Sequence, residues 1–248
     1  MTKMIKSYGD RLGDGKVQVS FTLPVDKSEE AKEAARVFAL SMNLEDPMVV
    51  SMESMGKGYS MFVVYAKCPT EIDYDSIKAV KVEIDVMSMY ECDDIIKTKI
   101  KKKLTIVGAC TGYDAHTVGI DAILNMKGYN GEYGLERYSQ LNVFNLGAQV
   151  LNKELIEKAI KLKADAILIS KVVTQQDIHI RDLTDFMKLF EKTNFPQGKP
   201  IVLIGGPRVN HALAVELGYD AGFGPGTTPN VVATYTIKKY LENHGMKL

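Results

Sequence analysis

The second half of the chain alternates short apolar runs with longer helical patterns, and this alternation constrains the fold more than any other feature. The apolar runs cover residues 104–107, 140–146, 166–169, 201–204 and 220–223. The helical patterns that follow them cover residues 117–126, 153–163, 183–191, 210–217 and 228–243. Strands and helices that alternate at this spacing form a doubly wound parallel sheet with right-handed crossovers. We therefore predict an α/β domain over residues 102–248.

The first part of the chain has a different pattern, in which apolar and polar residues alternate along strand-like runs. These runs cover residues 17–25, 48–55, 59–66 and 81–90. A helical pattern begins after Ser28, a residue type that often caps helix N-termini, and a lysine-rich helix or linker follows at 91–103. No cluster of side chains with obvious chemistry occurs here. We predict a small α+β domain over residues 1–101 that serves assembly or dimerisation.

Composition argues against several classes of function. Lys+Arg and Asp+Glu number 31 each, so the net charge is zero and nothing favours nucleic acid or an anionic membrane as a partner. No apolar run is long enough to span a bilayer, and the start of the chain lacks the apolar core of a signal peptide. Cys68, Cys92 and Cys110 form neither a zinc pattern nor a disulfide framework. We expect a cytoplasmic protein.

The loop after the first parallel strand holds the best candidate site. Ligands of such sheets bind at the carboxyl ends of the strands, and the segment Tyr113-Asp114-Ala115-His116-Thr117-Val118-Gly119 lies there. Asp114 stands two residues before His116. An aspartate that accepts the second imidazole N–H fixes the tautomer and orientation of the ring and raises its basicity as a metal ligand. The alternative is a loop histidine with an incidental acidic neighbour.

The pattern Asp114-x-His116-x-x-Gly119 resembles the signature of the cobalamin-binding domain, which has a Rossmann-like fold. Ser170-Lys171-Val172 and Gly205-Gly206 resemble later parts of that signature, although the family's serine motif usually ends in leucine. The resemblance implies that His116 is the axial cobalt ligand in a base-off, His-on complex, with Asp114 as its hydrogen-bond partner. The cofactor-binding residues that it implies are Tyr113, Asp114, Ala115, His116, Thr117, Val118, Gly119, Ser170, Val172, Gly205 and Gly206.

A glycine-rich loop, Gly222-Phe223-Gly224-Pro225-Gly226, stands just before the last predicted helix. Such a loop at a helix N-terminus can hold a phosphate or the edge of a nucleotide, but alone it is more often a tight connection. In the cobalamin family this loop lies near the nucleotide tail, which adds its five residues to the expected cofactor site. The Gly-x-Gly-x-x-Gly and Walker A motifs are absent. A nucleotide-binding α/β domain with a chance Asp-x-His remains an alternative.

Lys127 ends the helical pattern that follows His116, where a lysine is common because it complements the helix dipole. The segment 119–138, and the whole chain at lower specificity, resembles the small (β) subunit of lysine 5,6-aminomutase. In that family a lysine eleven residues after the cobalt-ligating histidine forms a Schiff base with pyridoxal phosphate, and here 127 − 116 = 11. The resemblance therefore implies that Lys127, like His116, is a catalytic residue.

This resemblance also implies an activity. The family's enzyme is an isomerase of lysine degradation that uses adenosylcobalamin and pyridoxal phosphate for a radical 1,2-migration. The terminal amino group of D-lysine or L-β-lysine moves from C6 to C5 and gives 2,5- or 3,5-diaminohexanoate. The β subunit acts only with a large α subunit, a barrel, in an α2β2 heterotetramer. D-Ornithine is an alternative substrate, and a corrinoid carrier of a methyltransferase system is an alternative function.

Overall fold

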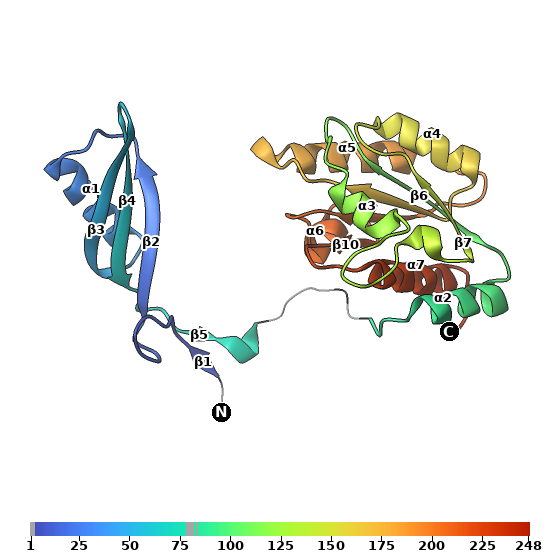
Figure 1. The fold of residues 1–248 in the computed structure, drawn as a ribbon, viewed down its shortest axis with the longest axis horizontal. Helices are drawn as coiled ribbons and strands as arrows, with labels where there is room; N and C mark the ends of the chain where they lie inside the picture. The colour runs from blue at the N-terminus through green and yellow to red at the C-terminus, as the bar shows by residue number, and fades with distance from the viewer. Residues whose placement is uncertain (1–2, 78–81, 83) are drawn as a thin grey trace. The chain divides into compact units, whose positions relative to one another are not determined.

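The computed structural model of the chain describes residues 3–77, 82 and 84–248, which form two compact units, Met1–Ala79 and Val80–Leu248 (Figure 1). The sequence pattern places the domain boundary later, between residues 101 and 102. The difference arises because helix α2 (Met89–Ile95) and the π-helical turn Ile96–Ile100 belong to the second unit. Cys92 and Ile96 are fully buried in the core of that unit. The lysine-rich segment is therefore only partly solvated.

The first unit is a three-stranded antiparallel sheet with one helix packed on it. Its strands β2 (Lys16–Leu23), β3 (Glu45–Gly56) and β4 (Tyr59–Lys67) lie in the order β2-β4-β3. Helix α1 (Glu29–Ser41) begins at Ser28, whose hydroxyl accepts the Ala31 N–H at 3.1 Å. Alanines at helical spacing face Phe62 and Val64 in the core: Ala31, Ala35 and Ala39. These elements confirm the predicted α+β pattern.

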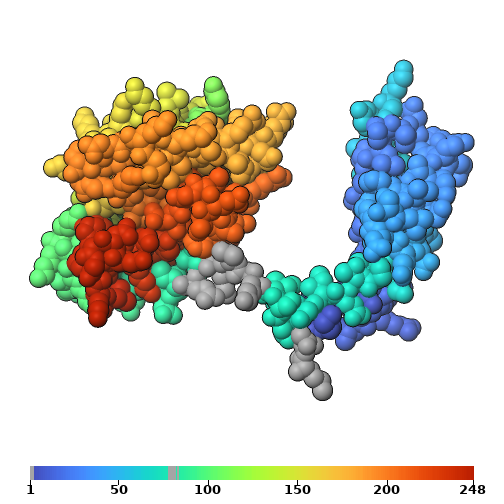
Figure 2. Space-filling view, turned by 180° about the vertical axis from the view of Figure 1, so that it is seen from behind, coloured from blue at the N-terminus to red at the C-terminus, as the bar shows by residue number. Residues whose placement is uncertain are grey.

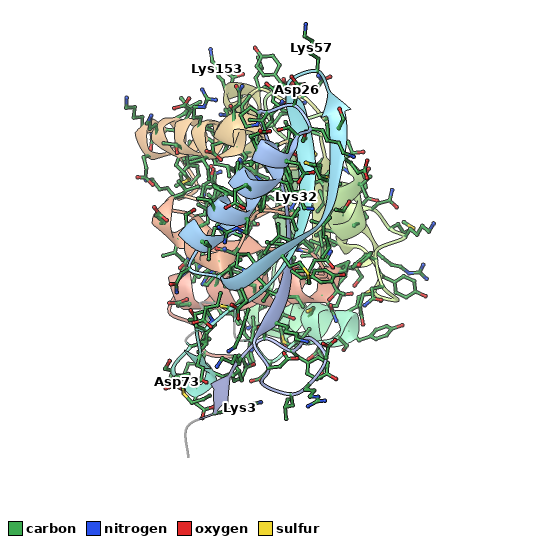
Figure 3. All side chains as sticks on the ribbon, turned by 90° about the vertical axis from the view of Figure 1, so that its left-hand side faces the viewer. Lys3, Asp26, Lys32, Lys57, Asp73 and Lys153 are labelled. Carbon is green, nitrogen blue, oxygen red and sulfur yellow. The ribbon has the colours of Figure 1, made fainter. Side chains whose placement is uncertain are left out.

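The ends of this unit are closed by short contacts. At one end, the Gly58 N–H donates to the Asp26 carboxylate at 2.6 Å, and Lys57 projects from the tip of the β3–β4 hairpin (Figure 3). At the other end, β1 (Met4–Ile5) pairs with β5 (Ile72–Asp73), and a 3₁₀ turn follows at Tyr74–Ser76. The Asp73 carboxylate caps this turn. The β3–β4 hairpin turns at Gly56-Lys57-Gly58, between the two strand-like runs predicted at 48–55 and 59–66.

The strand predicted over residues 81–90 is wrong for the residues that the structure describes there. Lys81 and Glu83 lie outside the described residues, and 84–88 have no regular secondary structure. Helix α2 begins after Ser88, whose hydroxyl accepts the Glu91 N–H at 3.3 Å while the Glu91 carboxylate accepts the Ser88 N–H at 2.7 Å. This reciprocal capping box favours a helix start strongly enough to override the alternating apolar pattern.

The second unit is a five-stranded parallel sheet with helices on both faces, which confirms the predicted fold class. The strands, in the spatial order β10-β9-β8-β6-β7, are β6 (Leu104–Cys110), β7 (Leu141–Asn145), β8 (Ala166–Ser170), β9 (Ile201–Gly205) and β10 (Ala221–Phe223). In chain order this arrangement is 2-1-3-4-5, a common doubly wound topology. Strands β6, β8, β9 and β10 are almost wholly buried because both faces are covered, whereas the edge strand β7 is partly exposed.

The helices of this unit divide between the two faces of the sheet (Figure 1). The remaining helices are α3 (Val118–Leu124), α4 (Asn152–Leu162), α5 (Ile178–Lys192), α6 (His211–Glu216) and α7 (Pro229–Asn243), with 3₁₀ turns at Leu135–Arg137 and Gln175–Asp177. Helices α2, α3 and α7 build one core layer, and α4, α5 and α6 build the other. Figure 2 shows the second layer from behind, with the segment around α5 in orange. Within the described parts of the chain, every helix is too short or too polar to cross a membrane.

Candidate functional site

The order of the parallel strands defines where this sheet can bind a ligand. The chain leaves β6 toward α3 on one face and leaves the adjacent strand β8 toward α5 on the other face. The two connections separate at this switch point and open a crevice at the carboxyl ends of the strands. The segment that contains His116 follows β6, and Ser170 ends β8. The sheet topology thus brings the first two sequence motifs to the same crevice.

His116 and Asp114 form the pair that their spacing predicts. The His116 Nδ1 lies 3.1 Å from Oδ1 of Asp114, and the same oxygen accepts the His116 backbone N–H at 3.0 Å. The Asp114 side chain is 1% exposed, whereas the His116 side chain is 60% exposed. Among the described residues no group bonds to the other ring nitrogen, Nε2. The ring is therefore held from the protein side and presents Nε2 outward, as a metal ligand requires.

The buried Asp114 carboxylate also ties the two connections of the crevice together. Its Oδ2 accepts the backbone N–H groups of Val172 at 2.5 Å and Val173 at 3.0 Å. Burial by itself would raise the pKa of this carboxyl. The N–H donors of Val172, Val173 and His116 outweigh burial and hold the Asp114 pKa below its usual value. Asp114 is therefore ionised and fixed at neutral pH.

Asp114→Asn should lower the stability of the second unit at neutral pH and make that stability less sensitive to acid pH. A carboxyl whose folded pKa lies below the ordinary 3.8 stabilises the fold above that pH, and the contribution disappears as the pH falls through the lower folded value. Asparagine accepts weaker hydrogen bonds, so we expect the free energy of unfolding to fall by about 2 kcal/mol at pH 7. The deficit should shrink below pH 3.8. Urea unfolding at several pH values measures it, with the exposed Asp185→Asn as control; a pH-independent deficit contradicts the assignment.

A cleft of about 370 Å³ runs from the histidine segment across the carboxyl ends of the strands. Its walls come from α3, from the ends of β8 and β9, and from the loop between β10 and α7. Apolar side chains such as Ile123, Leu168 and Val232 line the interior. A Cβ added to Gly119 would lie 2.9 Å from the Ser170 Oγ, so the glycine keeps this passage open. The cleft suits the flat, largely apolar end of an extended ligand.

Most residues of the predicted cofactor site line this cleft. They are Val118, Gly119, Ser170, Val172, Gly205, Gly206, Phe223, Gly224, Pro225 and Gly226. Tyr113 and Ala115 are exposed beside His116, and Thr117 precedes α3, so these three flank the cleft. Gly222 does not line it. A Cβ there would lie 2.4 Å from the Asn210 carbonyl oxygen and 2.7 Å from the Ala214 Cβ, so Gly222 is needed for close packing against α6.

Lys127 lies in a tight turn, because α3 ends at Leu124 rather than near residue 126. The turn closes on itself: a Cβ on Gly134 would lie 1.7 Å from the Asn125 carbonyl oxygen. The Lys127 N–H donates to the Asn125 side chain at 3.0 Å. Its own side chain is exposed, and within the described residues its amino group has no carboxylate partner. Tyr129 of the same turn lines the cleft, so the lysine lies on a closed loop near the site.

Cys110 and Lys171 are contacts of the site that the sequence analysis does not single out. The Cys110 thiol donates to the His116 carbonyl oxygen at 3.2 Å. Burial, together with the nearby Asp114 carboxylate, raises the pKa of this thiol to about 11. Lys171 follows directly after Ser170 and is 2% exposed. The only signal for Lys171 is its place inside the serine motif, where a buried lysine is unexpected.

Comparisons with known proteins agree with this geometry. The family model for the B12 binding domain matches residues 104–233, and the one for the dimerisation domain of d-ornithine 4,5-aminomutase matches residues 4–81. The lysine 5,6-aminomutase beta subunit of Acetoanaerobium sticklandii is 48% identical over 234 residues, which cover 94% of this chain and 89% of the relative. That of Fusobacterium nucleatum is 50% identical over 238 residues, covering 96% and 90%. Both alignments span nearly the whole of each protein.

A third relative matches in a different way. The D-ornithine 4,5-aminomutase subunit beta of Acetoanaerobium sticklandii is 34% identical over 243 residues. The alignment covers 97% of this chain but only 31% of that protein. The chain therefore corresponds to one part of the ornithine relative and to nearly all of the two lysine relatives.

Proposed function

The chain belongs to the family of lysine 5,6-aminomutase β subunits and carries a B12-binding domain, and we propose that it binds adenosylcobalamin and pyridoxal phosphate for a radical 1,2-amino migration. The proposed substrates are D-lysine and L-β-lysine, whose terminal amino group moves from C6 to C5 to give 2,5- or 3,5-diaminohexanoate. The two lysine relatives, similar along their whole length, support lysine over D-ornithine.

The observation that carries the proposal is the His116–Asp114 pair. A histidine whose Nδ1 is held by a buried carboxylate, and whose Nε2 points outward, is arranged to replace the cofactor's own base beneath cobalt. Cobalamin would thus bind base-off and His-on. The displaced nucleotide tail then needs a cleft near the histidine, and the apolar passage past Gly119 and Ser170 offers one.

The two cofactors have separate tasks on this chain. When bound, adenosylcobalamin would supply a carbon radical, and pyridoxal phosphate would supply the aldehyde carbon that gives the substrate's own nitrogen a π-bond for the migration. His116 orients the first cofactor. The exposed amino group of Lys127 would hold the second covalently through its aldehyde, on a turn that is closed by its own backbone. The substrate pocket would belong to the large α subunit.

The first unit would serve assembly. Its match to a dimerisation-domain family supports a role in joining subunits, and we propose an α2β2 heterotetramer with the α barrel subunit. Activity would require that partner. A cytoplasmic location is in line with the odd number of cysteines.

Gly119→Leu should block the cleft without unfolding the unit. Leucine would direct its side chain toward the Ser170 Oγ, which lies 2.9 Å from the Cβ position. Because a well-filled pocket loses roughly 1–3 kcal/mol per misfitted group, we expect cobalamin affinity to fall by about 10- to 100-fold. Isothermal titration with cobalamin measures the effect, with Gly119→Ala as a milder step and the exposed Lys158→Leu on α4 as control. Equal affinity for the leucine variant and the parent contradicts this use of the cleft.

An activity assay tests the proposal as a whole. The chain is purified with its α subunit and supplied with both cofactors, and D-lysine, L-β-lysine and D-ornithine are each offered. We expect diaminohexanoate from the two lysines, and none when either cofactor is omitted. Cobalamin binding without amino migration, accompanied by transfer of a methyl group to an acceptor, would favour the corrinoid carrier instead.

A further inference from the structure

Lys171 is a charged residue of the second unit that is almost completely buried. It is 2% exposed, at the point where the chain leaves β8. Its Nζ donates to the Thr111 carbonyl oxygen and, at 2.7 Å, to Oδ2 of Asp182 on α5. Its backbone N–H donates to the Gly205 carbonyl oxygen at 2.8 Å. One residue thus joins the connections after β6, β8 and β9.

The contacts of Lys171 complete those of Asp114. In the segment 111–116, the Asp114 carboxylate accepts the N–H groups of Val172 and Val173. In the segment 171–173, the Lys171 ammonium donates to the Thr111 carbonyl oxygen. The loop that carries His116 is therefore bonded to the connection after β8 at two points, Thr111 and Asp114. The connection after β7 holds it as well, through bonds from the Gly112 N–H to the Val150 carbonyl oxygen and from the Gln149 N–H to the Asp114 carbonyl oxygen.

The space around the ion pair allows little rearrangement. A Cβ added to Gly112 would lie 2.8 Å from Oδ2 of Asp182 and 3.3 Å from the Lys171 Nζ, and Gly112 has a φ of +67°. A Cβ added to Gly206 would lie 2.0 Å from the Lys171 carbonyl oxygen. Gly112 thus approaches the ammonium of Lys171 and Gly206 approaches its main chain, so both parts of the residue have little room to move.

The Lys171 ammonium is buried, and its partner Asp182 has a side chain that is 28% exposed. Such an ion pair is a poor source of stability, because desolvation of the lysine offsets most of the attraction. The charge of Lys171 is better explained by what it holds. We propose that Lys171, neutralised by Asp182, is a positioning residue for His116. Lys171 holds the Thr111 carbonyl oxygen in place and so orients the histidine toward cobalt. The inference rests on the proposed role of His116 as the cobalt ligand.

The test removes both charges together, so that neither is left without its partner. The full chain with Lys171→Met and Asp182→Asn is purified with its α subunit and loaded with cob(II)alamin, after ¹⁵N-histidine labelling. The electron paramagnetic resonance spectrum reports the axial nitrogen, because ¹⁵N gives a two-line splitting. We expect a reduced two-line fraction and a cobalamin affinity about 10- to 100-fold weaker than that of the parent. Lys171→Gln with Asp182→Asn keeps a neutral donor for Thr111 and should recover most of both signals.

A matched ion pair provides the control. Lys102 and Asp165 lie 2.7 Å apart at the other end of β8; this pair is matched in distance, with the acid as the buried partner, since the Asp165 side chain is 10% exposed and the Lys102 side chain 52%. Lys102→Met with Asp165→Asn should change thermal stability and leave the histidine signal as in the parent. A folded Lys171→Met/Asp182→Asn protein with the parent's signal and affinity would overturn the inference.

Two further outcomes are also decisive. If the methionine variant does not fold, Lys171→Leu with Asp182→Leu repeats the test with an apolar pair. Failure of both pairs to fold would show that Lys171 is needed for the fold itself and would reject a positioning role. A parent protein without the two-line splitting refutes the role of His116, which is a failure of the proposed function and not of this inference alone.

Discussion

His116→Ala should remove the protein nitrogen from the electron paramagnetic resonance spectrum of bound cob(II)alamin and weaken cobalamin binding by at least about 100-fold. The imidazole is the cobalt ligand in the proposed function, because its Nε2 faces outward while Asp114 holds Nδ1 at 3.1 Å. Alanine leaves the backbone contact of residue 116 to Asp114 intact, so the loop keeps its path. The variant therefore separates ligation from folding.

The measurement uses the complex with the α subunit, with and without ¹⁵N-histidine labelling. The parent should change from a three-line to a two-line splitting on labelling, and His116→Ala should show no such change. His244→Ala is the control, because the His244 ring packs on Tyr240 at the end of α7 and its Nδ1 lies 2.8 Å from the Tyr240 carbonyl oxygen. A label-dependent splitting that survives in His116→Ala would assign another ligand to cobalt.

The fold of the second unit could be predicted because its inner strands, such as β8 and β9, are buried on both faces. Such strands are continuous apolar runs, and the runs at 166–169 and 201–204 coincide with β8 and β9 to within one residue. The ends of helices were harder. The pattern after His116 continues to residue 126, but the close approach of Gly134 to Asn125 ends α3 at Leu124. Contacts between distant segments thus decided where the local pattern stopped.

The site was predictable where each motif lies at a strand end, and unpredictable where contacts cross between strands. Asp114 and His116 are two residues apart, so their pairing follows from local spacing. The bonds from Asp114 to Val172 and Val173 exist because β6 and β8 are neighbours in the sheet, which the chain order does not reveal. The contact of Lys171 with Thr111 is hidden in the sequence for the same reason. Gly222 was assigned to the cofactor because a glycine that serves helix packing looks the same in a sequence.

Lys127→Ala should abolish covalent attachment of pyridoxal phosphate to this chain. The amino group of Lys127 is exposed on a turn closed by Asn125 and Gly134, so it can reach an aldehyde outside the unit without any rearrangement of the fold. Borohydride reduction of the parent complex should fix the label, and peptide mass spectrometry should find it on Lys127. The alanine variant should carry no label and should lose amino migration with it, because the nitrogen chemistry depends on this cofactor.

Two controls separate this loss from general damage. Lys127→Arg keeps the positive charge but cannot attach to an aldehyde, so it should fail as fully as alanine. Lys153→Ala removes another exposed lysine, whose side chain on α4 is 80% exposed, and should keep both label and activity (Figure 3). The Lys127→Ala complex should still bind cobalamin, because Tyr129 of this turn lines the cleft and Lys127 does not. An unlabelled Lys127 in a parent complex that binds cobalamin would contradict the two-cofactor mechanism, and the chain would then be better explained as a corrinoid carrier.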